Sequence, residues 1–166
     1  MFFIRSVTEA DLPRVQALLK DSWMRTYAPH EGEAAVKRIS DDIHAIRVLK
    51  EQMERPHSEF ILADDGTDIG GTGYAYMRGE DEAYVQGLHV THAVHGQGVG
   101  SDLLSELETS FPAARRVTLN LHPKNETAAS FYTKRGYVEI APEVVVHECH
   151  EMPNRTFTKK LDGWEL

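Results

Sequence analysis

The chain has 166 residues and a net charge of −8, which suit one acidic domain with a single core. We therefore expect residues 1–166 to form one domain. The negative charge disfavours general nucleic-acid binding, and no apolar run approaches the roughly 20 residues that cross a bilayer, so neither nucleic acid nor membrane is an expected partner. Because no secretory signal is recognisable at the start and Cys149 is the lone cysteine, we expect a cytoplasmic protein.

Hydrophobic periodicity divides the first half of the chain into short strands and helices. Apolar residues three and four apart indicate helices, and short runs of β-forming residues between turn residues indicate strands. Ser40-Asp41-Asp42 predicts a break within the second helical region, because such side chains often cap a new helix. In chain order, the predicted elements are a strand at residues 2–5, a helix over 12–23, helices over 34–53, and strands at 59–63 and 69–77 joined by a hairpin turn.

The second half predicts strands connected by helical crossovers. Gly87, inside a predicted strand at residues 82–90, suggests a β-bulge. Hairpins in the first half and crossovers in the second indicate an α/β (α+β) fold, a mixed sheet with helices on both faces. The remaining elements are a helix that ends before Pro112, a strand at 116–121, a helix from Asn125 to Gly136, and strands at 137–141, 144–147 and 156–161 that complete the sheet.

A glycine-rich loop, His95-Gly96-Gln97-Gly98-Val99-Gly100-Ser101, lies between a predicted strand and an amphipathic helix. Backbone N–H groups and the helix dipole converge on an anion at such a place, and glycine lets a phosphate approach the main chain. The loop lacks the lysine that a Walker motif needs before Ser101. It also lacks the G-x-G-x-x-G spacing and the later acidic residue of a dinucleotide site.

Two blocks of sequence carry a family resemblance. Leu88-His89-Val90 and the following glycine loop resemble the acetyl-CoA motif of the GNAT superfamily of N-acetyltransferases, Arg/Gln-x-x-Gly-x-Gly/Ala, with His95 in place of Arg or Gln. Residues 125–137 resemble the second GNAT signature, N-x-x-A-x-x-F-Y-x-x-x-G-[FY], at every signature position. The resemblance implies a mostly antiparallel sheet of six to seven strands with a central splay, and acetyl-CoA as co-substrate. The cofactor-binding residues that it implies are Leu88, His89, Val90, His95, Gly96, Gln97, Gly98, Val99, Gly100, Ser101, Asn125 and Tyr132.

The resemblance also implies catalytic roles. Tyr132 matches the usual general acid of the family, and a phenol with an ordinary pKa of about 10 stays protonated at neutral pH. His122 directly follows the strand that faces the splayed strand, which makes it the first choice for the base that removes a proton from the amine. The alternative is a water relay, with His122 only packing against Pro123. Other ionisable groups near the presumed cleft are Glu80, Glu82 and His89.

The opening helix resembles the variable substrate helix of the family, so Trp23 and Tyr27 are expected to line the acceptor pocket. Residues 147–151 gather side chains of the metal-ligating kind, but neighbours in a strand point to opposite faces, so we expect no metal. The predicted function is acetyl-CoA-dependent transfer to a primary amine of a small acceptor, in a protein that forms a homodimer as many members of the family do. The alternatives are an acyl-CoA-binding regulatory module without transfer, and a phosphate-binding protein of another fold that binds ATP or NAD equally well.

Overall fold

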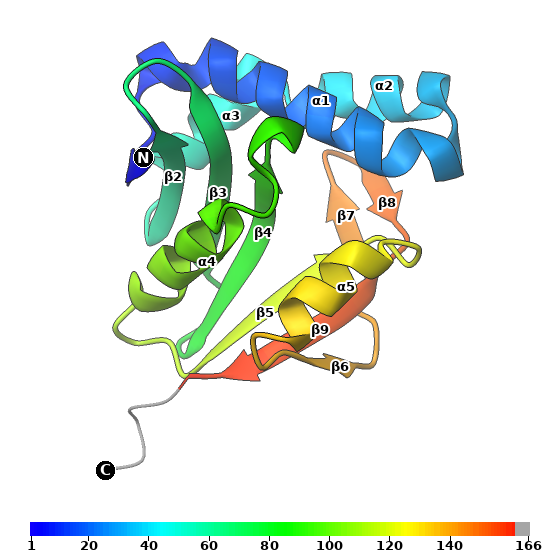
Figure 1. Cartoon of the computed structure of the whole chain (residues 1–166). Helices are drawn as coiled ribbons and strands as arrows, with labels where there is room; N and C mark the ends of the chain where they lie inside the picture. Colours follow the sequence, from blue (N-terminus) through cyan, green and yellow to red (C-terminus); the bar gives the residue numbers. More distant parts are fainter. Residues whose placement is uncertain (162–166) are drawn as a thin grey trace.

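The computed structural model describes residues 1–161, so the last five residues of the predicted domain lie outside the described part (Figure 1). None of the helices in residues 1–161 is both long and apolar enough to cross a bilayer. The helices are α1 (Leu12–Glu31), α2 (Glu33–Ile43), α3 (Ile46–Glu54), α4 (Val99–Thr109) and α5 (Glu126–Thr133). The strands are β1 (Phe3–Ser6), β2 (Ser58–Asp64), β3 (Ile69–Met77), β4 (Glu82–Val90), β5 (Arg116–Leu121), β6 (Val138–Ile140), β7 (Val145–His147), β8 (His150–Met152) and β9 (Arg155–Lys160).

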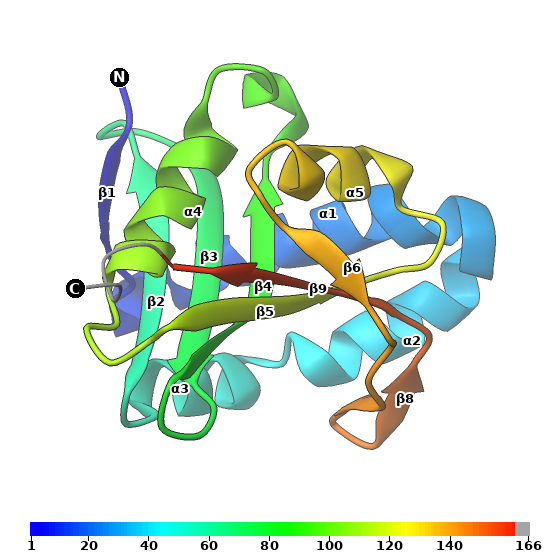
Figure 2. The ribbon, with the colours of Figure 1, turned by 90° about the horizontal axis from the view of Figure 1, so that it is seen from below.

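Seven strands form one sheet in the order β1-β2-β3-β4-β5-β9-β6. All neighbouring strands are antiparallel except β4 and β5, which are parallel and pair from Glu82–Arg116 to Val85–Leu119. Beyond Val85 the two strands diverge, and Figure 2 shows β5 and β9 crossing the direction of β2, β3 and β4 at a steep angle. The sheet is therefore mixed, mostly antiparallel and splayed in the middle, which confirms the predicted fold class.

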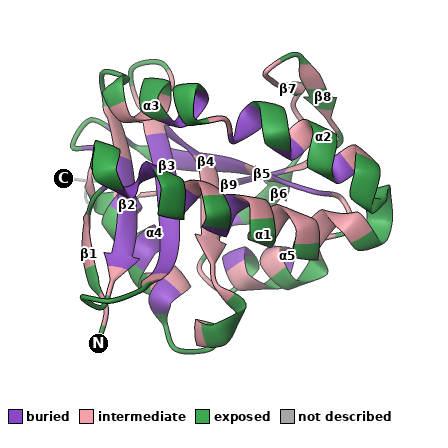
Figure 3. Ribbon diagram, turned by 90° about the horizontal axis from the view of Figure 1, so that it is seen from above, coloured by how far each residue is buried: buried purple, intermediate pink, exposed green. Residues whose placement is uncertain are grey.

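Different helices cover the two faces of the sheet (Figure 3). The buried apolar residues of α1 and α3 pack on one face with Phe60, Leu62 and Tyr74. Those of α4 and α5 pack on the opposite face with Ile61, Ala75 and other alternate strand residues. This arrangement follows from strand geometry, because successive side chains of β2 point to opposite faces and each face is apolar.

The glycines of β3 bring α4 close to the sheet. A Cβ atom added to Gly71 would lie 2.8 Å from the carbonyl oxygen of His89 and 2.9 Å from a methyl group of Leu103. One added to Gly73 would lie 2.9 Å from Leu107. The unusual run of glycines in this strand therefore lets the helix that follows the glycine loop dock directly on the strands beneath it.

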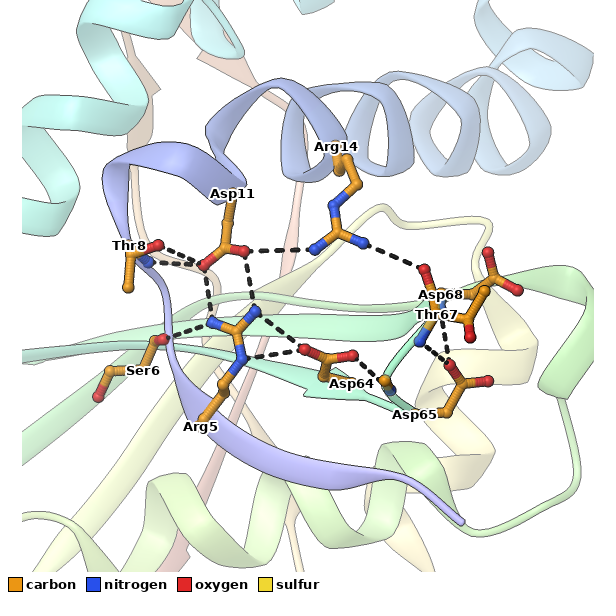
Figure 4. Close-up of polar contacts among 10 residues, drawn as sticks. Arg5, Ser6, Thr8, Asp11, Arg14, Asp64, Asp65, Thr67 and Asp68 are labelled. Atoms are coloured by element: carbon orange, nitrogen blue, oxygen red, sulfur yellow. Dashed lines mark hydrogen bonds and ion pairs between the residues drawn. The ribbon is translucent and has the colours of Figure 1, made fainter.

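A partly buried ionic network fixes the start of the chain (Figure 4). Arg5 donates to both carboxylate oxygens of Asp11 at 2.7 and 2.8 Å and to Asp64 at 3.0 Å, and the Thr8 backbone N–H also donates to Asp11. The hydrogen bonds from Arg5 hold the pKa of Asp11 far below its usual range. These contacts tie β1 and the start of α1 to the end of β2.

Two predicted details of the secondary structure are wrong. The break between α2 and α3 falls at His44 and Ala45 instead of Ser40–Asp42, because Ser40 is buried and its hydroxyl bonds His44 Nδ1 at 2.8 Å instead of capping a helix. The strand near residue 145 does not join the main sheet, since β7 pairs with β8 in a separate hairpin.

The bulge in β4 is displaced by one residue from its predicted position. Tyr74 pairs with Gly87 and Ala75 pairs with Val85, so Gln86 is the extra residue. A bulge at this point bends β4 where its pairing with β5 ends. The bulge therefore lies at the mouth of the splay.

Candidate functional site

Figure 1 shows β4 diverging from β5. A cleft of about 1250 Å³ lies at this divergence, since residues of both strands line it. Its walls come from α1, α2, the second half of β4, the start of α4, the end of β5, α5 and the β7–β8 hairpin. The pairing of β4 with β5 ends at Val85. Residues 86–90 of β4 therefore have no neighbouring strand on their β5 side within residues 1–161. The cleft receives Trp23, Tyr27, Leu88, His89, Val90, His95, Gly96, Gly98, Val99, Gly100, Ser101, His122, Asn125 and Tyr132, which is every predicted site residue except Gln97.

The glycine loop has the geometry of an anion site. Gly96 and Gly98 have φ angles of 80° and 82°, and Gly98 is the N-cap residue of α4. The first hydrogen bond of α4 runs from Asp102 N–H to the Gly98 carbonyl at 3.0 Å. The N–H groups of residues 99–101 are therefore not used within the helix and point out of its positive end. The loop and helix can bind a phosphate group.

Two side chains, those of His95 and Arg135, hold the glycine loop in place. The His95 ring bonds the Val90 carbonyl at 2.9 Å, which ties the loop to the end of β4. Arg135, at the end of α5, donates to the Ser101 hydroxyl from Nε at 2.9 Å and stacks 3.6 Å from the centre of the Phe131 ring. A role for Arg135 at the loop was not predicted from the sequence, although Arg135 directly precedes Gly136 of the second signature block.

Tyr132 is buried, with its ring between those of Phe131 and Tyr137 at centroid distances of 5.0 and 5.4 Å. Burial raises the pKa of its phenol, so the group stays protonated. No hydrogen bond to its hydroxyl is seen within residues 1–161, and no buried polar side-chain atom there lacks a partner. The unbonded hydroxyl must therefore reach the open cleft, where it can donate a proton.

Aromatic rings line a further part of the cleft, which we call the acceptor end because the sequence predicts that Trp23 and Tyr27 line the acceptor pocket. The rings of Trp23 and Tyr27 meet edge to face at 4.6 Å, and Tyr27 lies 5.1 Å from the ring of His122. The His30 ring stacks on that of His122 at a centroid distance of 5.7 Å. Burial raises the pKa of Tyr27 to about 12, so its hydroxyl is also neutral. The acceptor end consists of Trp23, Tyr27, His30, Glu31 and His122.

His122 is buried and uses both ring nitrogens. Its Nδ1 accepts a hydrogen bond from the Lys124 backbone N–H at 3.1 Å, and its Nε2 lies 2.7 Å from Oε1 of Glu31. An imidazole that accepts through Nδ1 carries its proton on Nε2, so His122 donates to Glu31. Removal of a proton by His122 would therefore require one of these two hydrogen bonds to open.

Three histidines, His44, His89 and His147, are among the residues that line a second cavity, of about 50 Å³. The His89 side chain bonds the Ser22 hydroxyl at 2.9 Å, so its ring turns toward α1 while its backbone lines the cleft. Burial lowers the pKa of His44 to about 3 and that of His89 to about 4, and it also lowers the pKa of His147. All three rings are neutral at pH 7.

Acid is expected to destabilise the fold through His44. The unfolded chain protonates this histidine near pH 6.5 and the folded chain only near pH 3, so between these values the unfolded state binds more protons and stability falls as pH falls. The loss reaches about 2 kcal/mol at pH 5. In His44→Gln, the difference in unfolding free energy between pH 7 and pH 5 should shrink by about this amount. The exposed His92→Gln is the control, and an unchanged difference in His44→Gln would contradict the assignment.

The cluster at residues 147–151 forms the β7–β8 hairpin. His147 pairs with His150, and Glu148 and Cys149 make the turn with φ angles of 47° and 62°. Within residues 1–161 there is no group of three or more His, Cys, Asp or Glu side chains placed to hold a metal ion.

Asn125 caps α5, because its Oδ1 accepts from the Ala128 N–H at 3.1 Å.

Comparisons with known proteins identify the fold and the family of the chain. No curated protein matches the chain. The fold is similar to the PaiA N-acetyltransferase from Thermoplasma acidophilum in complex with coenzyme A, with a TM-score of 0.87 and 19% identity over 97% of this chain and 99% of that one. An acetyltransferase of the GNAT family from Staphylococcus aureus gives a TM-score of 0.78 and 14% identity over 98% and 100% of the two chains.

An acetyltransferase from Thermus thermophilus gives a TM-score of 0.73 and 17% identity over 97% of each chain. At these identities the structural likeness establishes the fold. The family follows from the sequence itself, since residues 27–155 match the acetyltransferase (GNAT) domain. Because this match spans more than half of the chain, the protein belongs to the GNAT family of acetyltransferases, which use acetyl-CoA as co-substrate.

Proposed function

We propose that the protein transfers the acetyl group of acetyl-CoA directly to a primary amine of a small acceptor. The observation that carries this proposal is the shared cleft: the anion loop, the open half of β4, the Tyr132 hydroxyl and the aromatic acceptor end all line it. Direct transfer needs the thioester and the amine in one enclosed space, because the two reacting atoms must approach to about 3 Å.

The proposed reaction uses groups that the cleft already presents. The N–H groups of Val99, Gly100 and Ser101 hold the pyrophosphate, and Arg135 adds a positive charge beside them. Backbone donors of β4 face the thioester oxygen, where negative charge develops; one such donor is typically worth about 3 kcal/mol of barrier. The amine nitrogen forms a bond to the carbonyl carbon, the carbon–sulfur bond breaks, and Tyr132 gives its proton to the thiolate.

We assign the removal of the amine's proton to His122, as the sequence suggests. Its Nδ1 lone pair is held by the Lys124 N–H and its Nε2 proton by Glu31, so this step requires that the ring exchange a hydrogen-bond partner. A water relay through the acceptor end is the alternative. The pH profile of His122→Ala distinguishes the two, because a water relay leaves both the rate and its pH dependence unchanged.

The rival function is a regulatory module that binds acyl-CoA without transfer. An unbonded Tyr132 hydroxyl in the cleft favours the enzyme, since a sensor has no use for a proton donor there. The test is release of the CoA thiol from acetyl-CoA in the presence of primary alkylamines, amino acids, aminoglycosides and peptides. Release that depends on an amine supports the proposal. Tight binding of acetyl-CoA without release to any amine supports the sensor.

The place of action and the assembly also belong to the proposal. A cytoplasmic location and a homodimer stay predictions from the sequence and the family resemblance. Gel filtration with light scattering of the purified protein tests the second of these directly.

A further inference from the structure

Four carboxylate side chains line the cleft: Asp21, Glu31, Glu126 and Glu151. Two of them are neutralised by arginine, with Asp21 at 2.9 Å from Arg25 and Glu126 at 3.0 Å from Arg155. Glu151 is exposed on the β7–β8 hairpin. Glu31 differs from all of these, because it lies at the acceptor end and its side-chain partner within residues 1–161 is the imidazole of His122, not an arginine.

The hydrogen bonds of His122 determine the charge of this pair. Nδ1 accepts from the Lys124 N–H, so the ring is neutral and donates its single proton from Nε2 to Oε1 of Glu31 at 2.7 Å. The Glu31 carboxylate therefore keeps its full negative charge. No hydrogen bond to its second oxygen, Oε2, is seen in the described chain, and the side chain is 46% exposed.

The chain holds Glu31 in place from two directions. Glu31 is the last residue of α1, and Gly32, with a φ of 87°, ends the helix by donating from its N–H to the Ala28 carbonyl at 2.9 Å. The ring of His122, which bonds Glu31, itself packs against those of Tyr27 and His30. The C-terminal end of α1 adds the negative end of a helix dipole to the carboxylate. This point of the cleft therefore attracts a cation.

We propose that Oε2 of Glu31 binds an ammonium group of the acceptor, and that His122, in addition to the proton removal already assigned to it, holds the carboxylate toward the cleft. The inference rests on the proposed function and narrows its substrate class. The acceptor is an aliphatic primary amine, which is protonated at neutral pH, and arylamines, which are neutral there, are disfavoured. An ammonium–carboxylate contact in a partly enclosed aromatic cleft is a strong, charge-assisted hydrogen bond.

The first test measures binding without turnover. Protein labelled with ¹⁵N and saturated with CoA is titrated with ethylamine hydrochloride, and separately with ethanol as the neutral match, while the His122 ring signals are followed by NMR. We expect the ring to carry its proton on Nε2 and none on Nδ1. The chemical shift of Nε2 should change on addition of ethylammonium and stay the same on addition of ethanol. In Glu31→Gln the apparent affinity for ethylammonium should fall about 10-fold or more. Glu33→Gln, which removes the same charge two residues away on exposed α2, should behave as the wild type.

The second test separates recognition from chemistry. With the alkylamine that the wild type acetylates fastest, Glu31→Gln should raise KM for the amine about 10-fold and leave KM for acetyl-CoA within about twofold. His122→Leu should raise KM for the amine similarly, whereas His122→Gln, which keeps an N–H donor, should restore most of the affinity.

Each outcome bears on a different proposal. Ethylammonium that fails to perturb His122 in the wild type, or that binds Glu31→Gln as tightly, would overturn the role of Glu31 even in an active enzyme. If ethylammonium shifts the His122 signals only when Glu31 is present, but the protein transfers acetyl to no amine, the cation site is supported. That result would count against the proposed transfer and not against the role of Glu31.

Discussion

Tyr132→Phe is expected to lower kcat about 100-fold or more and to leave the affinity for acetyl-CoA within about twofold. The phenol is the proposed proton donor, and its hydroxyl makes no hydrogen bond within residues 1–161. Phenylalanine keeps the ring contacts with Phe131 and Tyr137, so the packing of α5 should survive. Steady-state thiol release and calorimetric titration with CoA measure the two quantities separately.

Tyr137→Phe is the matched control, because it makes the same chemical change five residues away. The Tyr137 hydroxyl donates to Glu108 at 2.8 Å, and Tyr137 does not line the cleft. Its loss should lower the free energy of unfolding by about 1 kcal/mol and leave kcat unchanged. Equal activity of the Tyr132 and Tyr137 variants would remove Tyr132 from the catalytic step.

Gly98→Val is expected to weaken the binding of acetyl-CoA about 100-fold. Gly98 has a φ of 82°, which a β-branched residue avoids at a cost of about 1–2 kcal/mol. Relief of this strain turns the peptide groups at the start of α4 away from the phosphate. Loss of two charge-assisted hydrogen bonds, at about 1.5 kcal/mol each, accounts for the expected change.

Gly66→Val separates strain from binding. Gly66 lies in the β2–β3 turn with a φ of 93°, and a Cβ atom added at either glycine meets nothing within 4 Å. The two variants should therefore lose similar unfolding free energy, measured by chemical denaturation. Only the Gly98 variant should lose affinity for CoA, measured by calorimetry. A similar loss of affinity in both variants would mean that the loop contributes to binding only through general stability.

Much of the fold could be predicted from local sequence. The glycine loop and the helix after it were found because a positive φ at residues 96 and 98 needs glycine, and because α4 is strongly amphipathic. Asn125 and Gly136 marked the two ends of the α5 region by ordinary capping chemistry. The splay of β4 was implied by the family resemblance, and the structure confirms it.

What escaped prediction depends on contacts between distant residues. Serine often caps a helix, but Ser40 is buried and bonds His44, so the helix continues through it. Glu31 lies 91 positions before His122, and no pattern near the end of α1 signals that the two side chains meet. Arg135 gains its place beside the glycine loop only when the fold brings it to Ser101 at the start of α4. Such pairings follow from tertiary packing, which a local periodicity does not encode.

The most direct test of amine acetylation uses acetyl-CoA labelled with ¹³C in the acetyl group. The purified protein is incubated with matched pairs of primary alkylamines and alcohols of equal chain length, and the products are identified by mass spectrometry and NMR, with Tyr132→Phe in parallel. We predict labelled amides from the amines, no esters from the alcohols, and at least about 100-fold slower formation in the variant. Labelled esters alone, or no labelled product despite tight binding of acetyl-CoA, would contradict the proposed N-acetyltransferase function.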